Sequence, residues 1–249
     1  MLTYNVLADP ADADIRTDSL LRTIREADAD IIALQEVAPW FVERLRREQW
    51  VKAYEFTLGE GQSRAVGGLV IMSRLPIADK AYVPLAGRQR RGFLLATVRV
   101  GDHTLAVGTV HLESFLEDGP IRARQIDTVF AFLRRHPDAI LMGDFNFGDR
   151  EDPESSRLEA EYADLWLSLK PDEPGFTWDI DRSGMARRGS FPGERSRRLD
   201  RILLKSALWG PAEVRIIGDR PVAEGGSVFP SDHFGLAGRI ETGTAGPNR

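Results

Sequence analysis

Two apolar, strand-like segments with almost nothing between them constrain the fold most. Residues 92–100 (GFLLATVRV) and 104–114 (TLAVGTVHLES) have the composition of strands, and Gly101-Asp102 joins them. A Gly-Asp connection between two such runs predicts a β-hairpin. Elsewhere, helix-like and strand-like segments are interspersed. The chain is therefore expected to form an α/β fold of two packed, mostly antiparallel or mixed β-sheets with helices outside, rather than a doubly wound parallel sheet.

The remaining elements are predicted from apolar periodicity and from continuous apolar runs. Strands are predicted at residues 2–7, 30–37, 67–77, 138–147, 198–206, 212–219 and 232–241. Helices are predicted at residues 17–29, 39–50 and 121–136, the first with a cap at Thr17 or Asp18. The chain has no internal repeat and no linker with a shift in composition. We therefore expect one domain over residues 1–241 and a frayed tail over 242–249.

Composition excludes several classes of protein. The 249 residues include no cysteine, which excludes disulfides, thiolate metal sites and a cysteine nucleophile. No segment reaches the roughly 18 apolar residues of a membrane span. A soluble, cytoplasmic protein without a membrane partner is predicted, and a monomer, because no coiled coil or long apolar edge is evident. The net charge of −5 argues against non-specific coating of nucleic acid, but not against an enzyme with a local basic groove.

Arginine is clustered in two stretches of this acidic chain. The shorter stretch holds Arg88, Arg90 and Arg91. The longer stretch, residues 182–201, holds Arg182, Arg187, Arg188, Arg195, Arg197, Arg198 and Arg201. On charge alone, a solvated loop is favoured for such segments.

Five predicted strands end or begin in polar residues capable of chemistry. These residues are Asn5, Glu36, His111 with Glu113, Asp144 with Asn146, and Asp232 with His233. A lone histidine or glutamate at a strand end is more often structural. Burying so many acids and histidines without partners is costly, however. The five sets are therefore expected to satisfy one another, to bind a cation, or to do both.

Asp144 and Asn146 are the most informative of these pairs. They interrupt the apolar run AILMGDFNF, and Gly143 allows the strand to bend beside them. Side chains at positions i and i+2 of a strand point to the same face. A carboxylate and a carboxamide are therefore expected to point at one spot.

The residue types favour one kind of chemistry. Hard oxygen ligands come from Glu36, Asp144 and Asp232, and no thiol is available. Neutral donors and acceptors come from Asn5 and Asn146, and donors to an anion from His111 and His233. Such a set suits Mg²⁺ or Mn²⁺ rather than zinc. The reaction that it suggests is attack of water on a phosphate ester.

Six motifs then carry a family resemblance. TYNVL, LQEV, HLES, GDFNF, RLDRIL and SDHFGL occur in this order between residue 3 and about residue 236. They resemble the endonuclease/exonuclease/phosphatase superfamily. The resemblance implies a DNase I-like, four-layer α/β sandwich with two central sheets, which agrees with the strand pattern.

Within the superfamily, the sequence is most similar to the 5′-tyrosyl-DNA phosphodiesterase branch. The similarity rests on Arg124 and Gln125 downstream of HLES, on GDFNFGDRE at 143–151 and on FTWDI at 176–180. Two departures remove possible phosphate or substrate contacts. Leu116 stands where that branch usually has an arginine after HLEST, and Gly148 replaces the arginine of GDTNLRD. The departures leave the core chemistry intact and the exact substrate open.

The resemblance also implies a role for each site residue. Glu36 is expected to bind Mg²⁺, for which Mn²⁺ could substitute, with Asn5 and Asp232 completing the shell or positioning its water. Asp144 is expected to orient or deprotonate the attacking water, and Asn146 to fix water and phosphate.

The other implied roles concern the phosphate and its surroundings. His233 is expected to donate to a phosphate oxygen, with Asp200 holding its tautomer and favouring its protonated form. His111 is expected to contact the phosphate from the other side, with Ser114 as a second donor. Trp178 is either a stacking wall for a base or aromatic leaving group, or a packing residue. With these roles in place, the arginine-rich stretch 182–201 is better interpreted as a substrate-facing loop.

The leading prediction is a Mg²⁺-dependent phosphodiesterase that acts on DNA ends and removes 5′-tyrosyl adducts. The first alternative is another phosphoesterase of the superfamily, acting on abasic DNA, RNA, or a lipid or inositol headgroup. A lipid hydrolase is expected to carry an exposed apolar loop or membrane anchor, and neither is evident. The second alternative is a non-catalytic binding module. Such a module would lack a member of the metal and nucleophile set, and none is missing.

Overall fold

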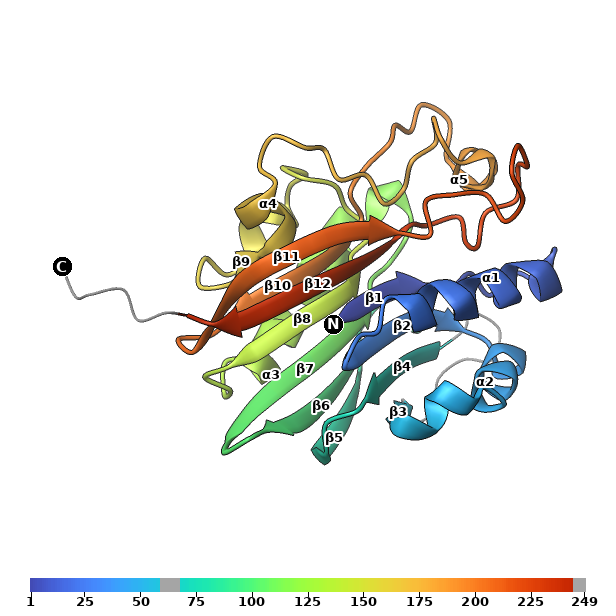
Figure 1. Cartoon of the computed structure of the whole chain (residues 1–249). Helices are drawn as coiled ribbons and strands as arrows, with labels where there is room; N and C mark the ends of the chain where they lie inside the picture. Colours follow the sequence, from blue (N-terminus) through green and yellow to red (C-terminus); the bar gives the residue numbers. More distant parts are fainter. Residues whose placement is uncertain (59–67, 244–249) are drawn as a thin grey trace.

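Two six-stranded β-sheets dominate the computed structural model, which describes residues 1–58 and 68–243 (Figure 1). The first sheet contains, in spatial order, β11 (Trp209–Ile217), β12 (Gly235–Thr242), β1 (Leu2–Asn5), β2 (Ile31–Val37), β4 (Gly68–Ser73) and β3 (Glu55–Leu58). The second contains β5 (Ile77–Pro84), β6 (Gly92–Val100), β7 (His103–His111), β8 (Ala139–Asp144), β10 (Asp200–Lys205) and β9 (Ala163–Asp164). Both sheets mix parallel and antiparallel pairs, as predicted.

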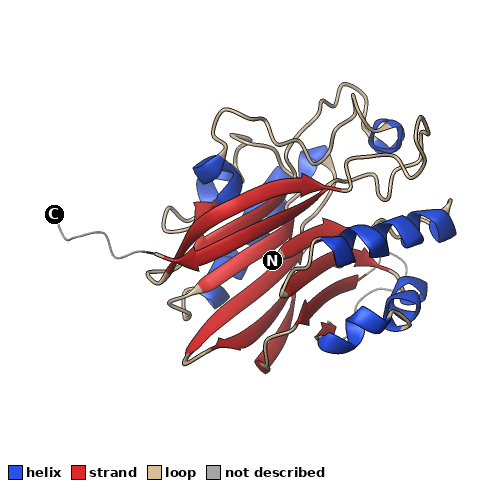
Figure 2. Cartoon of the chain, in the orientation of Figure 1, coloured by secondary structure: helices blue, strands red, loops and turns tan. Residues whose placement is uncertain are grey.

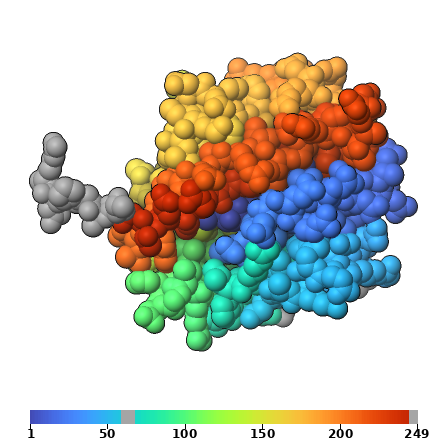
Figure 3. Space-filling model, viewed as in Figure 1, coloured from blue at the N-terminus to red at the C-terminus, as the bar shows by residue number. Residues whose placement is uncertain are grey.

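Helices cover the outer faces of the two sheets (Figure 2). Helices α1 (Ala13–Glu26) and α2 (Pro39–Arg46) pack on the first sheet, and α3 (Gly119–Leu133) packs on the second. Between the sheets, side chains such as Ala33 and Met142 form a shared apolar core. The layers therefore run helix, sheet, sheet, helix, which confirms the predicted four-layer sandwich. Parts of β11 and β12 are visible at the surface beside α1 (Figure 3), although Leu236 and Ala237 of β12 are buried.

The predicted hairpin is present. Val100 of β6 pairs with His103 of β7, and only Gly101 and Asp102 lie between them. Gly101 has a φ of 60°, a conformation that glycine adopts without a steric penalty. The predicted boundaries 92–100 therefore match β6, whereas β7 ends at His111 instead of continuing to residue 114.

Several other boundaries differ from the prediction. The segment 67–77 is not one strand, because it contains all of β4 and, at Ile77, the first residue of β5, which belong to different sheets. Pro76 lies between them and has no N–H for a strand ladder. The first helix begins at Ala13, four residues before the predicted cap at Thr17. The helix predicted over 39–50 ends at Arg46.

Short elements escaped prediction because each is too brief to show a period. They include β3, β9, α4 (Leu165–Leu169) and α5 (Gly184–Gly189). In the part of the chain that the structure describes, 3₁₀ turns at Gln49–Ala53, Leu116–Asp118 and Ser155–Arg157 complete the fold. Within residues 1–58 and 68–243, no helix has the length and apolar character needed to cross a bilayer. Of the predicted frayed tail, Thr242 ends β12, and residues 244–249 lie outside the described residues. The single-domain boundary stays a prediction.

Candidate active site

Parallel strand pairs place four predicted residues at one edge of the sandwich. Asn5 ends β1 beside β2, which carries Glu36 near its end. His111 and Asp144 end β7 and β8 and are direct register partners. The two edges meet, because Asn5 Nδ2 donates to Asp144 Oδ2 at 3.0 Å and to Glu36 Oε1 at 3.2 Å. One amide thus connects the carboxylates of both sheets.

Glu36 occupies an irregular position in β2. Its φ is 57°, and the register of β2 against β4 shifts between Leu34 and Val37. A side chain at positive φ is uncommon outside glycine, and such outliers gather at functional sites. The irregularity turns the carboxylate toward Asn5, while Glu36 Oε2 accepts a hydrogen bond from the Ala8 N–H at 3.1 Å.

Asp144 and Asn146 do meet, but not as alternate residues of one strand. Strand β8 ends at Asp144, and Asn146 has a φ of 55°. The expectation of a strand reaching residue 147 is therefore wrong. A turn replaces it, in which the Asn146 N–H donates to Asp144 Oδ1 at 2.9 Å and Asn146 Nδ2 donates to the Leu112 carbonyl at 2.9 Å. Gly143 is required just before this turn, since a Cβ there would lie 2.1 Å from the Val110 carbonyl oxygen.

His111 is held as a neutral ring. Its Nδ1 lies 2.8 Å from the guanidinium of Arg91, which can only donate. Nδ1 therefore accepts, and the ring proton is on Nε2, 3.4 Å from Asp144 Oδ2. Burial lowers the pKa of His111 well below its ordinary value, and the charges of Arg91 and His233 act in the same direction.

His233 has the opposite character. Its Nδ1 lies 2.9 Å from Asp200 Oδ2, the contact that the sequence predicts, and its Nε2 lies 3.6 Å from Asp144 Oδ2. Burial lowers the pKa of His233, but the charges of Asp200 and Asp144 outweigh burial and raise this pKa well above the ordinary value. Burial raises the pKa of Asp144 to about 6, although His233 and the hydrogen bonds from Asn5 and Asn146 oppose this change.

Asp232 adds a further carboxylate to the cluster. Ser231 Oγ lies 2.7 Å from the Asn5 carbonyl oxygen and 3.2 Å from Asp232 Oδ1. Burial raises the pKa of Asp232, and the charge of Glu36 acts in the same direction, so these two acids lie close enough to repel each other. The buried guanidinium of Arg16 donates to the carbonyl of Pro230 nearby and also interacts with Asp232.

The remaining two predicted residues lie around this cluster. The Ser114 N–H donates to Gln89 Oε1 at 2.8 Å, and Gln89 Nε2 donates to Ser114 Oγ at 2.9 Å. Trp178 is 7% exposed, and its ring centroid lies 5.0 Å from that of His233. Its burial leaves little of the ring for a base to stack on and favours the packing alternative, with Trp178 supporting His233.

The arginine-rich stretch 182–201 contains both exposed and buried arginines. Arg182, Arg187, Arg188 and Arg195 are exposed, as the solvated-loop interpretation predicts. Arg198 and Arg201 are buried and pair with Asp149 and Asp164, and Arg197 is buried against Glu151. These three arginines neither face solvent nor face the active site residues. Arg197 also pairs with Glu194, three residues away. Its partner Glu151 and the partners of Arg198 and Arg201 lie far away in the sequence, so charge clustering could not reveal them.

Sequence reasoning also missed three residues that shape the site. They are Arg91, Ser231 and Arg16. Arg91 belonged to a cluster interpreted as solvated, yet only 8% of it is exposed. Arg16 resembles an ordinary surface residue at the start of a helix. Ser231 had one usable signal, its place directly before Asp232 and His233 in SDHFGL.

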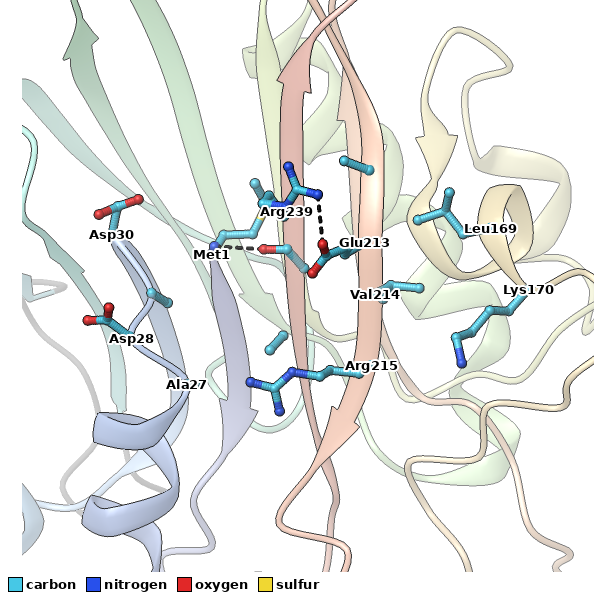
Figure 4. A pocket seen from close by; sticks show the side chains of 14 residues that line it. Met1, Ala27, Asp28, Asp30, Leu169, Lys170, Glu213, Val214, Arg215 and Arg239 are labelled. Carbon is cyan, nitrogen blue, oxygen red and sulfur yellow. Dashed lines mark hydrogen bonds and ion pairs between the residues drawn. The ribbon is translucent and has the colours of Figure 1, made fainter.

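A cavity of about 510 Å³ lies elsewhere, against β11 and β12 (Figure 4). Met1, Asp30, Glu213 and Arg239 help to line it, and none of the predicted site residues does. Some of its charged groups are already paired, with Arg239 donating to Glu213 at 2.7 Å and the Met1 amine donating to the Gly238 carbonyl at 2.9 Å. The candidate chemistry therefore lies at the strand ends and not in this cavity.

The acidic cluster fits a divalent cation. Asp144, Asp200 and His233 offer ligand atoms within 4.8 Å of one another, so this group could hold a metal ion. Oδ1 of Asp200 is buried without a hydrogen-bond partner among the described residues. His233 is a poor ligand, however, because a protonated ring has no free lone pair. Glu36 and Asp232 supply oxygen ligands without this conflict.

Fold and site together define a class of protein. The sequence profile of the Endonuclease/Exonuclease/phosphatase family matches residues 2–233, and the chain belongs to this family. The predicted family and fold are thereby confirmed.

Particular relatives narrow the comparison. The chain is 28% identical over 245 residues to tyrosyl-DNA phosphodiesterase 2 of Xenopus laevis, covering 94% of this chain and 64% of the relative. It is 28% identical over 214 residues to the Mus musculus protein of that name, covering 83% of this chain and 56% of the relative. The chain thus spans less than two thirds of these curated relatives.

A solved structure of a relative is also similar. TDP2 of Danio rerio, crystallised with a single-strand DNA product, superposes with a TM-score of 0.86 at 25% identity, covering 97% of this chain and 98% of the other.

Proposed function

We propose that this protein is a metal-dependent phosphodiesterase that releases tyrosine from 5′-phosphotyrosyl DNA ends. One observation carries the proposal: His111 Nε2 and His233 Nε2 lie 3.4 Å and 3.6 Å from Oδ2 of the buried Asp144, where the edges of two sheets meet. The pKa of His111 is lowered and the pKa of His233 is raised, which favours a neutral and a protonated ring. This arrangement can accept a proton and donate to an anion at the same place. The names of the curated relatives and the DNA product in the Danio rerio structure support the substrate.

Asp144 is the proton acceptor in this proposal. A pKa of about 6 leaves its carboxylate ionised at neutral pH, yet basic enough to take a proton from water. The Asn146 N–H and Asn5 Nδ2 each donate to a different oxygen of Asp144 and fix its plane. The water oxygen then bonds to phosphorus, and the bond from phosphorus to the tyrosine oxygen breaks.

The two histidines have different tasks. Protonated His233 donates from Nε2 to a phosphate oxygen, while Asp200 holds its Nδ1. Neutral His111 donates from Nε2, and Arg91 fixes this tautomer through Nδ1. Donors placed where negative charge develops stabilise the transition state without rearranging. The leaving phenol has a pKa near about 10 and therefore needs little help from a general acid.

Glu36 and Asp232 are the residues that would hold Mg²⁺, with Mn²⁺ as a possible substitute. A divalent cation bound there supplies positive charge to the phosphate oxygens. Asn5 holds the Glu36 carboxylate in position from the neighbouring strand. The predicted cytoplasmic location and monomeric state remain predictions.

The test uses a labelled oligonucleotide with a 5′-phosphotyrosyl end, assayed with Mg²⁺ and with a chelator. Metal-dependent release of a 5′-phosphate end, absent in Asp144→Asn, is the expected result. An abasic duplex and a plain single strand are assayed in parallel. Faster cleavage of either parallel substrate than of the phosphotyrosyl end would replace the proposed substrate by that of another phosphoesterase of the family. No cleavage of any substrate would leave the binding-module alternative.

A further inference from the structure

Two aromatic side chains from distant loops meet on the surface. The ring centroids of Phe115 and Phe191 lie 6.1 Å apart, at an interplanar angle of 59°. Phe115 is 37% exposed, and the adjacent Leu116 is 43% exposed. Leu116 occupies the position where the resemblance predicts an arginine. Large apolar side chains exposed together often mark a binding surface.

The aromatic pair of Phe115 and Phe191 lies between two sides of the active site. Phe115 directly follows Ser114, on the loop that leaves β7 after His111. Phe191 follows the end of α5 at Gly189, where an added Cβ would lie 3.1 Å from the Trp178 ring and 4.0 Å from Asp232 Oδ2. The chain between α5 and Phe191 therefore runs from the Asp232 side of the site to the His111 side. Figure 1 shows α5 beyond the end of the sheet where β12 begins.

Both aromatic residues are held in fixed loops. The Phe115 carbonyl accepts a hydrogen bond at 2.6 Å from buried Arg122, which also donates to Glu154 at 2.6 Å. Phe191 opens a turn in which its N–H donates to Glu194 Oε2 at 2.8 Å, and the Glu194 N–H donates to the Phe191 carbonyl at 3.0 Å. A preorganised aromatic surface loses little conformational entropy on binding.

Cations surround the aromatic pair. The guanidinium of Arg88 lies 5.7 Å from the Phe115 ring centroid, but Asp118 neutralises it. Arg90 and Arg195 are exposed, and within the described residues neither side chain has a hydrogen bond or ion pair. Each lies on a loop that carries or contacts one side of the pair. Phe191 is half-buried, whereas Phe115 is exposed. Aromatic rings at the surface among basic residues are the combination that binds single-stranded nucleic acid.

We propose that Phe115 and Phe191 bind the base of a nucleotide adjacent to the attacked phosphate by stacking. The proposal rests on the proposed function, because it concerns a nucleic acid substrate in the same site. Every base has an aromatic face, so the contact is tolerant of sequence. It also favours single-stranded ends, since a paired base inside a duplex already stacks on its neighbours.

The test removes bases from the substrate and rings from the protein. Oligonucleotides with a 5′-phosphotyrosyl end carry an abasic nucleotide at the first, second or third position. We expect base removal at one position to lower kcat/KM of the unmodified protein about tenfold, through KM. Phe115→Ser and Phe191→Ser should lower kcat/KM about tenfold on the intact substrate. In these variants, removing the base should lower kcat/KM little further.

Control variants separate stacking from folding. Phe115→Tyr and Phe191→Tyr keep an aromatic face and should restore the dependence on the base. Leu208→Ser changes an apolar side chain of similar exposure, 38%, on the loop before β11 and should have no effect. The proposal would be overturned if base removal lowered kcat/KM by the same factor in the unmodified protein and in both serine variants, at every position of the abasic nucleotide.

A binding experiment keeps this proposal distinct from the proposed function. A single-stranded oligonucleotide with a 5′-phosphate is titrated into Asp144→Asn and followed by fluorescence anisotropy. Weakening of about tenfold on adding Phe115→Ser or Phe191→Ser supports stacking, even if no phosphotyrosyl substrate is cleaved. Unchanged affinity in both double variants overturns stacking, even if phosphotyrosyl cleavage is confirmed.

Discussion

Two clusters of charged residues, each built around buried members, lie on either side of strand β10, and they differ in their balance of charge. The arginine–aspartate cluster of Arg198, Arg201, Asp149 and Asp164 has as many cations as carboxylates, and both aspartates accept from both arginines. The active site cluster has four carboxylates, Glu36, Asp144, Asp200 and Asp232, which outnumber its three cations, His233, Arg16 and Arg91. Equal numbers of positive and negative side chains suit a structural role. An excess of carboxylates over cationic side chains suits the binding of a cation.

Strand alternation separates the two clusters. Asp200 and Arg201 are neighbours in β10, and successive side chains in a strand point to opposite faces. Asp200 therefore contacts His233, and Arg201 contacts Asp149 and the Phe147 carbonyl. The same short segment thus serves stability on one face and chemistry on the other. Substitutions in each cluster should accordingly change different measured quantities.

The largest effect is expected from Asp144→Asn. Loss of the proton acceptor should lower kcat by about 10²- to 10⁴-fold, while the melting temperature changes little. Steady-state kinetics on the phosphotyrosyl oligonucleotide and thermal unfolding measure the two quantities. Glu213→Gln, at an exposed carboxylate far from the site, is the control. A variant that keeps most of its activity would exclude Asp144 as the base.

Arg201→Met should chiefly destabilise the fold. It leaves Asp149 and Asp164 with too little positive charge, and breaking a buried ion pair typically costs about 3–5 kcal/mol. Urea unfolding measures the loss, and kcat of the folded protein should persist. Arg239→Met, at an exposed ion pair, should cost less than about 1 kcal/mol. Lost activity at unchanged stability would place Arg201 in the active site instead.

Divalent cations should bind to the active site cluster, and so stabilise the fold, but should not bind to the arginine–aspartate cluster. Mg²⁺ at about 100 times its Kd should raise the free energy of unfolding by about 2.7 kcal/mol. Glu36→Gln should reduce this gain, since it removes a negatively charged oxygen ligand, and Glu213→Gln should leave it unchanged. Thermal unfolding with Mg²⁺ and with NaCl at equal ionic strength measures it. An undiminished gain in both Glu36→Gln and Asp232→Asn would locate the cation elsewhere.

Asp200→Asn should change the pH dependence of the rate. The charge of Asp200 raises the pKa of His233, so its removal lowers that pKa and the protonated fraction falls as pH rises. The ratio of variant to unmodified kcat should therefore fall as pH rises. Above both pKa values it should approach about one tenth of its low-pH value, for a pKa change of about one unit. Proton NMR of the imidazole gives the pKa directly. A ratio that is constant with pH would show that Asp200 only positions the ring.

Much of the fold and of the site composition was predictable from local patterns. Hairpin chemistry at Gly101-Asp102 and long apolar runs identified most strands. Residues at their ends identified the chemistry. The predicted strand boundaries were wrong where one residue interrupts an apolar run. Pro76 separates β4 from β5, and the turn at Asn146 follows the end of β8. Short elements such as α5 had no period to detect.

The sequence by itself determined the family, the layered sheets and the set of acids and histidines that converge at the strand ends. Only the tertiary structure decided their contacts and charge states. Asn5 meets Asp144 from a position 139 residues away, and Arg198 finds Asp149 across 49 residues. Burial, which no local pattern specifies, raises the pKa of Asp144 and lowers that of His111. Side-chain type is a local property, whereas partnership and desolvation depend on how distant segments pack.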